Sequence, residues 1–224
     1  KRAAGKVDFF IANSKYIAKQ ISSYYGREAQ IVNPPVADIF FEKPAFAEIS
    51  VGNPLVGGGY FLMVGRLLYY KGFDLGVRAF NQLQLPLKVI GQGPEEKKIR
   101  DLNLSPRTEF INYVSDRELR DLYCGARALI FPQIEDFGLV AAEAQAGGCP
   151  VIAFNQGGSR DIVIEGKTGL FFKEQKLEAI VRAVRNFEKM SFDRDFIARQ
   201  ARRFSRENFH RQIKEVVSRN GFSV

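Results

Sequence analysis

The chain has 224 residues, 46% of them hydrophobic and 26% charged, as in an ordinary globular protein, and no apolar run approaches the roughly 18 residues of a membrane-spanning helix. Its two cysteines, Cys124 and Cys149, offer neither a disulfide framework nor paired metal ligands, so we expect two buried thiols in a reducing cytoplasm. The net charge is +8, and residues 176–224 carry +6 of it (12 basic minus 6 acidic).

The first 36 residues read as the end of one domain followed by a linker. The stretch "VDFFIANS" predicts a strand that runs into a helix with Ser14 as its N-cap. Pro34 and Pro35 then stop regular structure, so the junction is expected at residues 33–36. Because the sequence begins at Lys1 rather than at a methionine, we expect a fragment of a longer protein.

Residues 37–175 alternate short apolar runs with helical patterns, which is typical of a parallel sheet covered by helices. After a flexible approach at 53–59, strands are predicted at 60–64, 87–90, 108–112, 128–131, 151–154 and 170–172. Helices are predicted near 73–83, 94–103, 116–124 and 139–147, and a capping box of Ser115 and Glu118 marks the start of the third. The pattern predicts an α/β domain with a doubly wound, Rossmann-like parallel sheet.

Residues 176–224 predict amphipathic helices that pack on this domain, with one break near "MSFDRD". Their basic surplus would suit nucleic acid, anionic lipid or water. Nucleic acid is disfavoured, because acidic residues are interspersed with the arginines and no aromatic stacking platform accompanies them. Peripheral membrane contact stays open, since helices that pack on a sheet and helices that lie on a membrane share this pattern.

Two cations follow the first strand of the predicted sheet. Ligands of open parallel sheets bind at the carboxyl ends of the strands. There, Gly65 permits close approach of the backbone, while Arg66 and Lys71 place positive charge near a helix start, where the helix dipole opposes it. A bound diphosphate would explain the two cations. Taken alone, two ordinary surface charges explain them equally well.

The second strand is followed by "GQGPEE", in which Gly91 and Gly93 begin a dinucleotide fingerprint. Glu96 stands where the third glycine is required, and no acid lies near residue 112 to bind a ribose. An NAD-dependent dehydrogenase is therefore disfavoured. The single histidine, His210, lies in the basic tail, so nucleophilic catalysis through histidine finds no support either.

The fourth strand leads into "EDFGLVAAEAQAGG", which carries two acids around a small-residue helix. A helix that begins near Phe137 would direct free N–H groups at the crevice and form an anion site. Glu135 lies before that start and Glu143 in the second turn, about 12 Å apart along a helix axis, so they would serve different parts of an elongated ligand. The alternative is that Glu135 caps the helix and Glu143 is solvated, but a carboxylate among alanines is costly to bury without a partner.

The fifth turn, "NQGGSRD", supplies two glycines near the same edge of the sheet. Ser159 or Asp161 is expected to cap the short helix that follows. Neither is expected to be catalytic.

Six stretches resemble, in order, the nucleotide-binding half of retaining glycosyltransferases of family four, the glycogen-synthase-like type with the GT-B fold. They are "VGRLLYYKGFDLGVRAF", "VIGQGPEEKKI", "VSDRELRDLYCGARALIFP", "EDFGLVAAEAQAGGCPVIA", "GGSRDIV" and "EGKTGLFF". The likeness runs from about Val7 to Phe209, and the two glutamates with seven residues between them are its most specific element. It implies the C-terminal half of a GT-B fold: residues 1–36 as a remnant of the acceptor-side domain and linker, 37–175 as the nucleotide-sugar-binding domain, and 176–224 as C-terminal helices.

The resemblance also implies roles for individual residues. Arg66 and Lys71 fall where the family binds the diphosphate and stabilises the leaving group, and Glu135 falls where it contacts the transferred sugar; these three are the expected catalytic residues. The expected donor-binding residues are Gly65, Gly91, Gly93, Tyr113, Val114, Leu119, Phe137, Gly138, Leu139 and Glu143. The backbone of 137–139 would hold sugar hydroxyls and phosphate oxygens, Glu143 the ribose, and 91–93 with 113–119 the base. No metal and no cofactor are expected, because the two cations and the helix start replace a divalent ion.

The implied reaction is retaining glycosyl transfer from a nucleoside diphosphate sugar to a polysaccharide, lipid-linked or other glycan acceptor. Asp136 stands where many relatives carry Gly, and "EDFG" followed by "EAQA" resembles the mannosyltransferase branch, which favours GDP-mannose. The acceptor would bind a preceding domain that this sequence largely lacks, so we expect donor binding but poor transfer by this chain alone. The alternative is a noncatalytic nucleotide-binding module that docks on a partner chain. The expected location is the cytoplasm, either free or peripheral at the inner membrane face.

Overall fold

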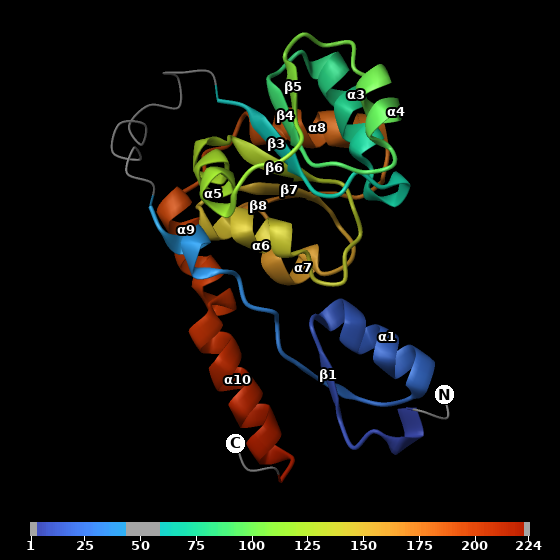
Figure 1. Ribbon diagram of the computed structural model, residues 1–224, viewed down its shortest axis with the longest axis vertical. Coiled ribbons are helices and arrows are strands. Elements are labelled where there is room, and N and C mark those ends of the chain that lie inside the picture. Colours follow the sequence, from blue (N-terminus) through green and yellow to red (C-terminus); the bar gives the residue numbers. More distant parts are fainter. Residues whose placement is uncertain (1–3, 44–58, 222–224) are drawn as a thin grey trace.

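The computed structural model describes residues 4–43 and 59–221 and has a six-stranded parallel sheet at its centre (Figure 1). The sheet order is β5-β4-β3-β6-β7-β8, and all neighbouring strands pair in parallel. The strands are β3 (Phe61–Val64), β4 (Leu87–Ile90), β5 (Thr108–Ile111), β6 (Ala128–Phe131), β7 (Val151–Phe154) and β8 (Gly169–Phe172). The predicted α/β fold with a doubly wound, Rossmann-like sheet is confirmed. Of the predicted approach at 53–59, all but the last residue lies outside the described residues.

Helices cover both faces of the sheet, because alternate side chains of each strand point to opposite sides. Phe61 and Met63 of β3 belong to one buried cluster, together with residues of α3 (Phe73–Leu83), α4 (Glu96–Asp101) and α8 (Leu177–Phe187). Leu62 and Val64 belong to the other, together with residues of α5 (Asp116–Gly125), α6 (Leu139–Ala146), α7 (Ser159–Ile162) and α9 (Arg194–Ala201). Figure 1 shows α3 and α4 on one side of the sheet and α5, α6 and α7 on the other.

Helix starts follow local side-chain chemistry at α5 but not at α6. Ser115 and Glu118 form both hydrogen bonds of the predicted capping box at α5. The helix α6 begins at Leu139, in agreement with the predicted range of 139–147 and not at Phe137, the start considered for the anion site. Gly138 precedes it in the left-handed conformation, with φ of 102°, and a residue in that conformation cannot continue a right-handed helix.

The prediction that Ser159 or Asp161 caps α7 is wrong. Gly158 is the N-cap residue, and no side chain caps the helix. The Ser159 hydroxyl lies instead within 2.9 Å of the carbonyl oxygens of Phe154 and Gln156, which ties the helix start to the end of β7. The Asp161 carboxylate instead accepts a hydrogen bond from the Lys15 N–H, at the start of the helix at 15–25.

Residues 10–31 form a separate β-α-β unit. β1 (Phe10–Ala12) runs into α1 (Lys15–Tyr25), and Ser14 caps this helix, as predicted, by accepting a bond from the Ile17 N–H at 3.1 Å. The sequence does not predict β2 (Ala29–Ile31), which pairs in parallel with β1. Three residues shortly before two prolines are too short a run to stand out as a strand. Figure 1 shows this unit below the main sheet, near α7.

The chain then returns to the main domain and ends in further helices. The linker is fixed by Val36, whose N–H donates to the Phe204 carbonyl at 2.8 Å, and η2 (Asp38–Phe41) packs on the core. The predicted break at 190–195 separates α8 from α9. A second break, at η4 (Arg202–Phe204), precedes α10 (Arg206–Arg219) and is not predicted. Within the two described ranges, no helix combines the length and the apolar character needed to cross a membrane.

Candidate functional site

The candidate site lies where the strand order reverses. β3 and β6 are neighbours at the centre of the sheet, with β4 and β5 on one side and β7 and β8 on the other. The helices that follow β3 and β6 cover opposite faces, so the loops after these two strands part at the carboxyl edge. Ligands of open α/β sheets bind in this crevice. Before they diverge, the two loops approach each other closely at Gly72, which has φ of 68°, since a Cβ there would lie 3.2 Å from Pro132 Cβ.

Lys71 and Glu135, predicted on two different loops, meet at this edge. Lys71 ends η3 (Tyr69–Lys71) after β3, and Glu135 lies in the loop after β6. Lys71 Nζ lies 2.8 Å from Glu135 Oε1, and their side chains are 15% and 29% exposed. Oε1 makes no hydrogen bond of regular geometry within the described residues, so the contact is an ion pair. Lys71, predicted to bind the diphosphate, is thus paired with Glu135, predicted to contact the sugar. An anionic ligand would compete with Glu135 for Lys71.

Arg66, predicted to act beside Lys71, is exposed. None of the ion pairs between residues of 4–43 and 59–221 includes it. The preceding Gly65 has φ of 148°, and a Cβ there would lie 3.9 Å from Lys71 Nζ. The glycine at position 65 therefore leaves the space next to Lys71 free of a side chain. Arg66, without an ion pair among the described residues, is available to a ligand.

The peptide groups around Glu135 are held from two sides. The Gly158 N–H donates to the Glu135 carbonyl at 2.8 Å. The Ser14 hydroxyl, from the separate β-α-β unit, donates to the Asp136 carbonyl. Gly157 permits the first contact, because its φ is 74° and a Cβ there would lie 2.6 Å from the Glu135 carbonyl oxygen. The glycines after β7 therefore shape the loop that carries Glu135.

Phe137, Gly138 and Leu139, predicted to hold the ligand through their backbone, form the entry to α6. The Phe137 side chain is buried and packs edge-on against Phe204, with ring centroids 5.3 Å apart, so it anchors the loop. Gly138 provides no side chain to cap the helix. The Ala141 N–H donates to the Gly138 carbonyl at 2.9 Å, whereas the N–H groups before it lie too early in the helix to have an intrahelical partner. The helix dipole favours negative charge there. This helix start is suited to an anion beside Lys71.

Glu143 lies half-buried in α6 rather than in solvent. Its Oε2 accepts a hydrogen bond from the Tyr123 hydroxyl of α5 at 3.4 Å. Burial raises the pKa of Glu143 to about 7, and the bond from Tyr123 opposes this shift only in part. Tyr123 is fully buried, and burial together with the Glu143 charge holds its pKa well above the usual value. The protein thus supplies one partner for Glu143, and the sequence carries no signal of this neighbour because α5 and α6 meet only in the fold.

Gly91 and Gly93, predicted to line a base, are explained by the close packing of two loops. A Cβ on Gly91 would lie 1.9 Å from the Gly65 carbonyl oxygen, and one on Gly93 would lie 2.3 Å from that of Leu67. The Leu67 N–H donates to the Gln92 carbonyl at 2.9 Å. The loops after β3 and β4 are therefore fixed to each other at the same edge as the ion pair.

The segment after β5, also predicted to line a base, divides into two kinds of side chain. Tyr113 is 81% exposed. Val114 and Leu119 are partly buried against the core. Tyr113 therefore offers an aromatic face to a ligand, whereas the other two side chains mainly support the fold.

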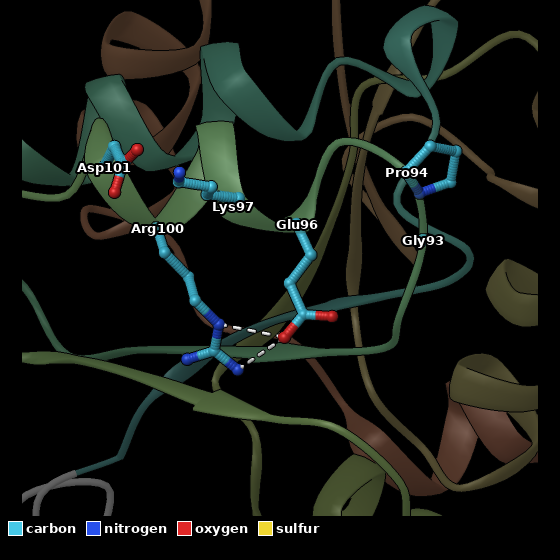
Figure 2. Close-up of a pocket in the computed structure, with 6 residues that line it drawn as sticks. All are labelled: Gly93, Pro94, Glu96, Lys97, Arg100 and Asp101. Atoms are coloured by element: carbon cyan, nitrogen blue, oxygen red, sulfur yellow. Dashed lines mark hydrogen bonds and ion pairs between the residues drawn. The ribbon is translucent and has the colours of Figure 1, made fainter.

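A hollow of about 430 Å³ lies beside this arrangement rather than within it. Figure 2 shows its lining, of which only Gly93 belongs to the predicted site: Gly93, Pro94, Glu96, Lys97, Arg100 and Asp101. Arg100 is paired with Glu96 at 2.9 Å and stacks over the Phe110 ring. Because this arginine is already engaged, the candidate site stays at the strand reversal, where Arg66 is free of ion pairs with the described residues. Those residues contain no group of three potential metal ligands, and the absence of a metal requirement stays a prediction.

Comparison with known proteins relates this architecture to one family. The family model described as "Glycosyl transferases group 1" matches residues 48–204, which is more than half of the chain. The glycogen synthase of Mycobacterium tuberculosis is 30% identical over 179 residues, covering 69% of this chain and 43% of that protein. The D-inositol 3-phosphate glycosyltransferase of Nocardia farcinica is 30% identical over 200 residues, covering 77% and 43%.

A solved structure shows the same fold. The Anabaena protein Alr3699/HepE, solved in complex with UDP and glucose, superposes with a TM-score of 0.75 at 21% identity, covering 95% of this chain and 63% of that one. The chain spans less than half of the length of the two curated relatives.

Proposed function

Because the chain belongs to the glycosyl transferases group 1 family, we propose that it binds a nucleoside diphosphate sugar and forms the donor side of a retaining glycosyltransferase. The observation that carries this proposal is the meeting of Lys71 and Glu135, 2.8 Å apart, beside the start of α6 at the strand reversal. These groups match the diphosphate-sugar part of a nucleoside diphosphate sugar. The lysine suits the phosphate charge, the carboxylate suits the sugar hydroxyls, and the helix start suits the phosphate oxygens.

In this proposal, Arg66, Lys71 and the α6 start bind the diphosphate and stabilise the charge that grows on it as the sugar departs. Preorganised donors aimed at developing charge commonly lower the barrier of an enzymatic reaction more than any other single effect. Glu135, released from Lys71 as the phosphates take over that cation, accepts hydrogen bonds from sugar hydroxyls. The backbone of Glu135 is held in place, because its carbonyl accepts a hydrogen bond from the Gly158 N–H.

Glu143 would bind the ribose. A carboxylate has about four acceptor positions, and Tyr123 occupies one of them. The ribose hydroxyls would use others, and their bonds favour the ionised form of Glu143. Nucleotide binding is therefore expected to lower the pKa of this group from its value of about 7 in the free protein.

The favoured donor is GDP-mannose, on the resemblance of "EDFG" and "EAQA" to the mannosyltransferase branch. Asp136 imposes no backbone strain in place of Gly, since among the described residues Gln84 is the one non-glycine residue with positive φ. Because the Anabaena structure holds UDP and glucose, UDP-glucose belongs in any test. The acceptor is proposed to be a polysaccharide, a lipid-linked or another glycan.

Calorimetric titration with GDP-mannose, UDP-glucose and ADP-glucose tests the proposal. One of the three is expected to bind with a dissociation constant below 1 mM. If none binds more tightly than that, the assignment of a donor site is wrong. Because poor transfer by this chain alone is expected in either case, the DNA upstream of Lys1 separates the two functions. An in-frame acceptor domain would support the glycosyltransferase, and its absence would favour the noncatalytic module that docks on a partner chain.

Tyr113→Ala is expected to weaken binding of the preferred nucleotide about fivefold, because stacking of a base on an aromatic ring contributes roughly 1 kcal/mol or more. The matched control is Tyr24→Ala, which removes an exposed ring from α1. Titration of the free nucleoside diphosphate measures both. Equal affinities for the Tyr113 and Tyr24 variants would show that the base lies elsewhere.

We further propose that residues 1–36 belong to the acceptor side, 37–175 to the donor domain and 176–224 to helices that support it. The two separate sheets, within residues 10–31 and 61–172, support this division. A cytoplasmic location, free or peripheral at the inner membrane face, stays a prediction.

A further inference from the structure

The start of α1 touches the loop that carries the proposed sugar-binding residues. Ser14 is fully buried, and its hydroxyl donates to the carbonyl oxygen of Asp136, 122 residues away. The hydroxyl oxygen of Ser14 also accepts the capping bond from the Ile17 N–H. One hydroxyl group therefore both starts α1 and holds the peptide between Asp136 and Phe137.

A second contact joins α1 to α7. The Lys15 N–H, in the first turn of α1, donates to Asp161 Oδ2 at 2.7 Å, and Lys15 Nζ lies 3.9 Å from Oδ1. The Asp161 side chain is 8% exposed. A carboxylate at this position satisfies a free N–H group and is favoured by the helix dipole. Asp161 therefore holds α1 and is not available as a ligand for sugar or phosphate.

The other side of Asp161 is fixed as well. The Arg203 guanidinium donates to the carbonyl oxygens of Asp161 and Ile162, at 3.3 and 2.7 Å. α7 is thus anchored to η4, whose Phe204 also packs on Phe137. The loop at Asp136 and the helix α7 at Asp161, both of which α1 touches, are therefore tied to the same element, η4.

We propose that Ser14 is a positioning residue for the donor sugar, and that Asp161 places it. The proposal rests on the proposed donor site. The Ser14 hydroxyl holds the peptide that joins Asp136 to Phe137. This peptide contains the N–H of Phe137 and lies one residue after Glu135. The affinity for the sugar, but not for the base and ribose, therefore depends on the docking of α1.

Capping alone does not account for these contacts. Ser205 caps α10 in the same way, by accepting a bond from the Asn208 N–H at 3.3 Å, and its side chain makes no other hydrogen bond to the described residues. Ser14 differs in donating to a loop of the other sheet. Ser205 is therefore a matched control, with the cap but without the contact to the loop.

The test compares Ser14→Gly with Ser205→Gly. Glycine is nearly as good an N-cap as serine, so both variants keep their helices but lose the hydroxyl. Calorimetry of the full chain measures the affinity for the best-binding donor of GDP-mannose, UDP-glucose and ADP-glucose, and for its nucleoside diphosphate. Ser14→Gly is expected to weaken the sugar nucleotide about fivefold and the diphosphate less than twofold, as the loss of one ordered hydrogen bond implies.

Further variants keep the inference testable if Ser14→Gly is unstable. Ser14→Thr, which retains a hydroxyl, is expected to keep the ratio of sugar-nucleotide affinity to diphosphate affinity at the parent value. Asp161→Ala is expected to lower this ratio, as Ser14→Gly does. The inference would be overturned if Ser14→Gly leaves both affinities unchanged, or if it weakens the sugar nucleotide and the diphosphate equally. It would also be overturned if Ser205→Gly causes the same losses as Ser14→Gly. If the parent chain binds no sugar nucleotide, the proposed function fails instead, so the two failures are distinguishable.

Discussion

Lys71→Ala is expected to weaken binding of the nucleoside diphosphate about 100-fold, because a charge-assisted bond to phosphate contributes roughly 1.5 to 3 kcal/mol. The variant also leaves the Glu135 carboxylate, 29% exposed and 2.8 Å from Lys71 Nζ in the parent, without its partner and facing the phosphates. Arg66→Ala is expected to cost about tenfold, since the guanidinium is exposed and solvent screens its charge. Calorimetry at constant ionic strength measures both.

The control for Lys71 is Lys88→Ala. Lys88 is also a partly shielded lysine paired with a glutamate, Glu109, but it lies in β4 and outside the proposed site. Its loss is expected to leave nucleotide affinity unchanged. If Glu135→Gln combined with Lys71→Ala recovers most of the affinity, repulsion by Glu135 accounts for the loss. Equal affinities of the Lys71 and Lys88 variants would remove Lys71 from the site.

Glu143→Gln is expected to stabilise the free protein at pH 8 by at most about 3 kcal/mol while weakening nucleotide binding about tenfold. Burial raises the pKa of Glu143 from 4.5 to about 7, so the folded state binds more protons than the unfolded state between these values. The cost of the ionised carboxylate is therefore full above pH 7 and vanishes below pH 4.5. The amide removes this cost but cannot accept the bonds of the ribose as a carboxylate does.

Thermal unfolding at pH 8 and pH 5 measures the stability effect, with Glu28→Gln as an exposed control on the β-α-β unit. The gain from Glu143→Gln should be present at pH 8 and much smaller at pH 5. In the parent, nucleotide affinity should fall as the pH drops below 7, because protonated Glu143 loses acceptor capacity. A gain of equal size at both pH values would show that Glu143 is not the titrating group.

The sheet could be predicted from the sequence because each strand is a short apolar run between clear helical patterns. The run at 128–131, for example, is buried throughout and begins and ends as predicted. β2 could not be predicted, because its three residues are half exposed and pair with an equally short strand. The start of α6 at Leu139 agrees with the predicted range of 139–147, whereas the start near Phe137 considered for the anion site is wrong, since Gly138 is in the left-handed conformation.

The sequence predicts which residues meet at the candidate site, but not which residues hold them in place. The rule for carboxyl edges of parallel strands brings Lys71 and Glu135 to one place, and the structure joins them as an ion pair. The partner Ser14 lies 122 residues from Asp136 in the chain, and Tyr123 lies 20 residues from Glu143, on a different helix. No spacing or periodicity links these two partners to the site. Such contacts depend on how α1 and α5 pack, which local patterns do not specify.

A crystal structure of this chain with its best-binding nucleotide tests the central claim most directly. The diphosphate should lie between Arg66, Lys71 and the start of α6, with the Lys71–Glu135 ion pair opened and the ribose hydroxyls on Glu143. A nucleotide bound instead in the hollow lined by Gly93, Lys97 and Arg100, with Lys71 still paired to Glu135, would contradict it.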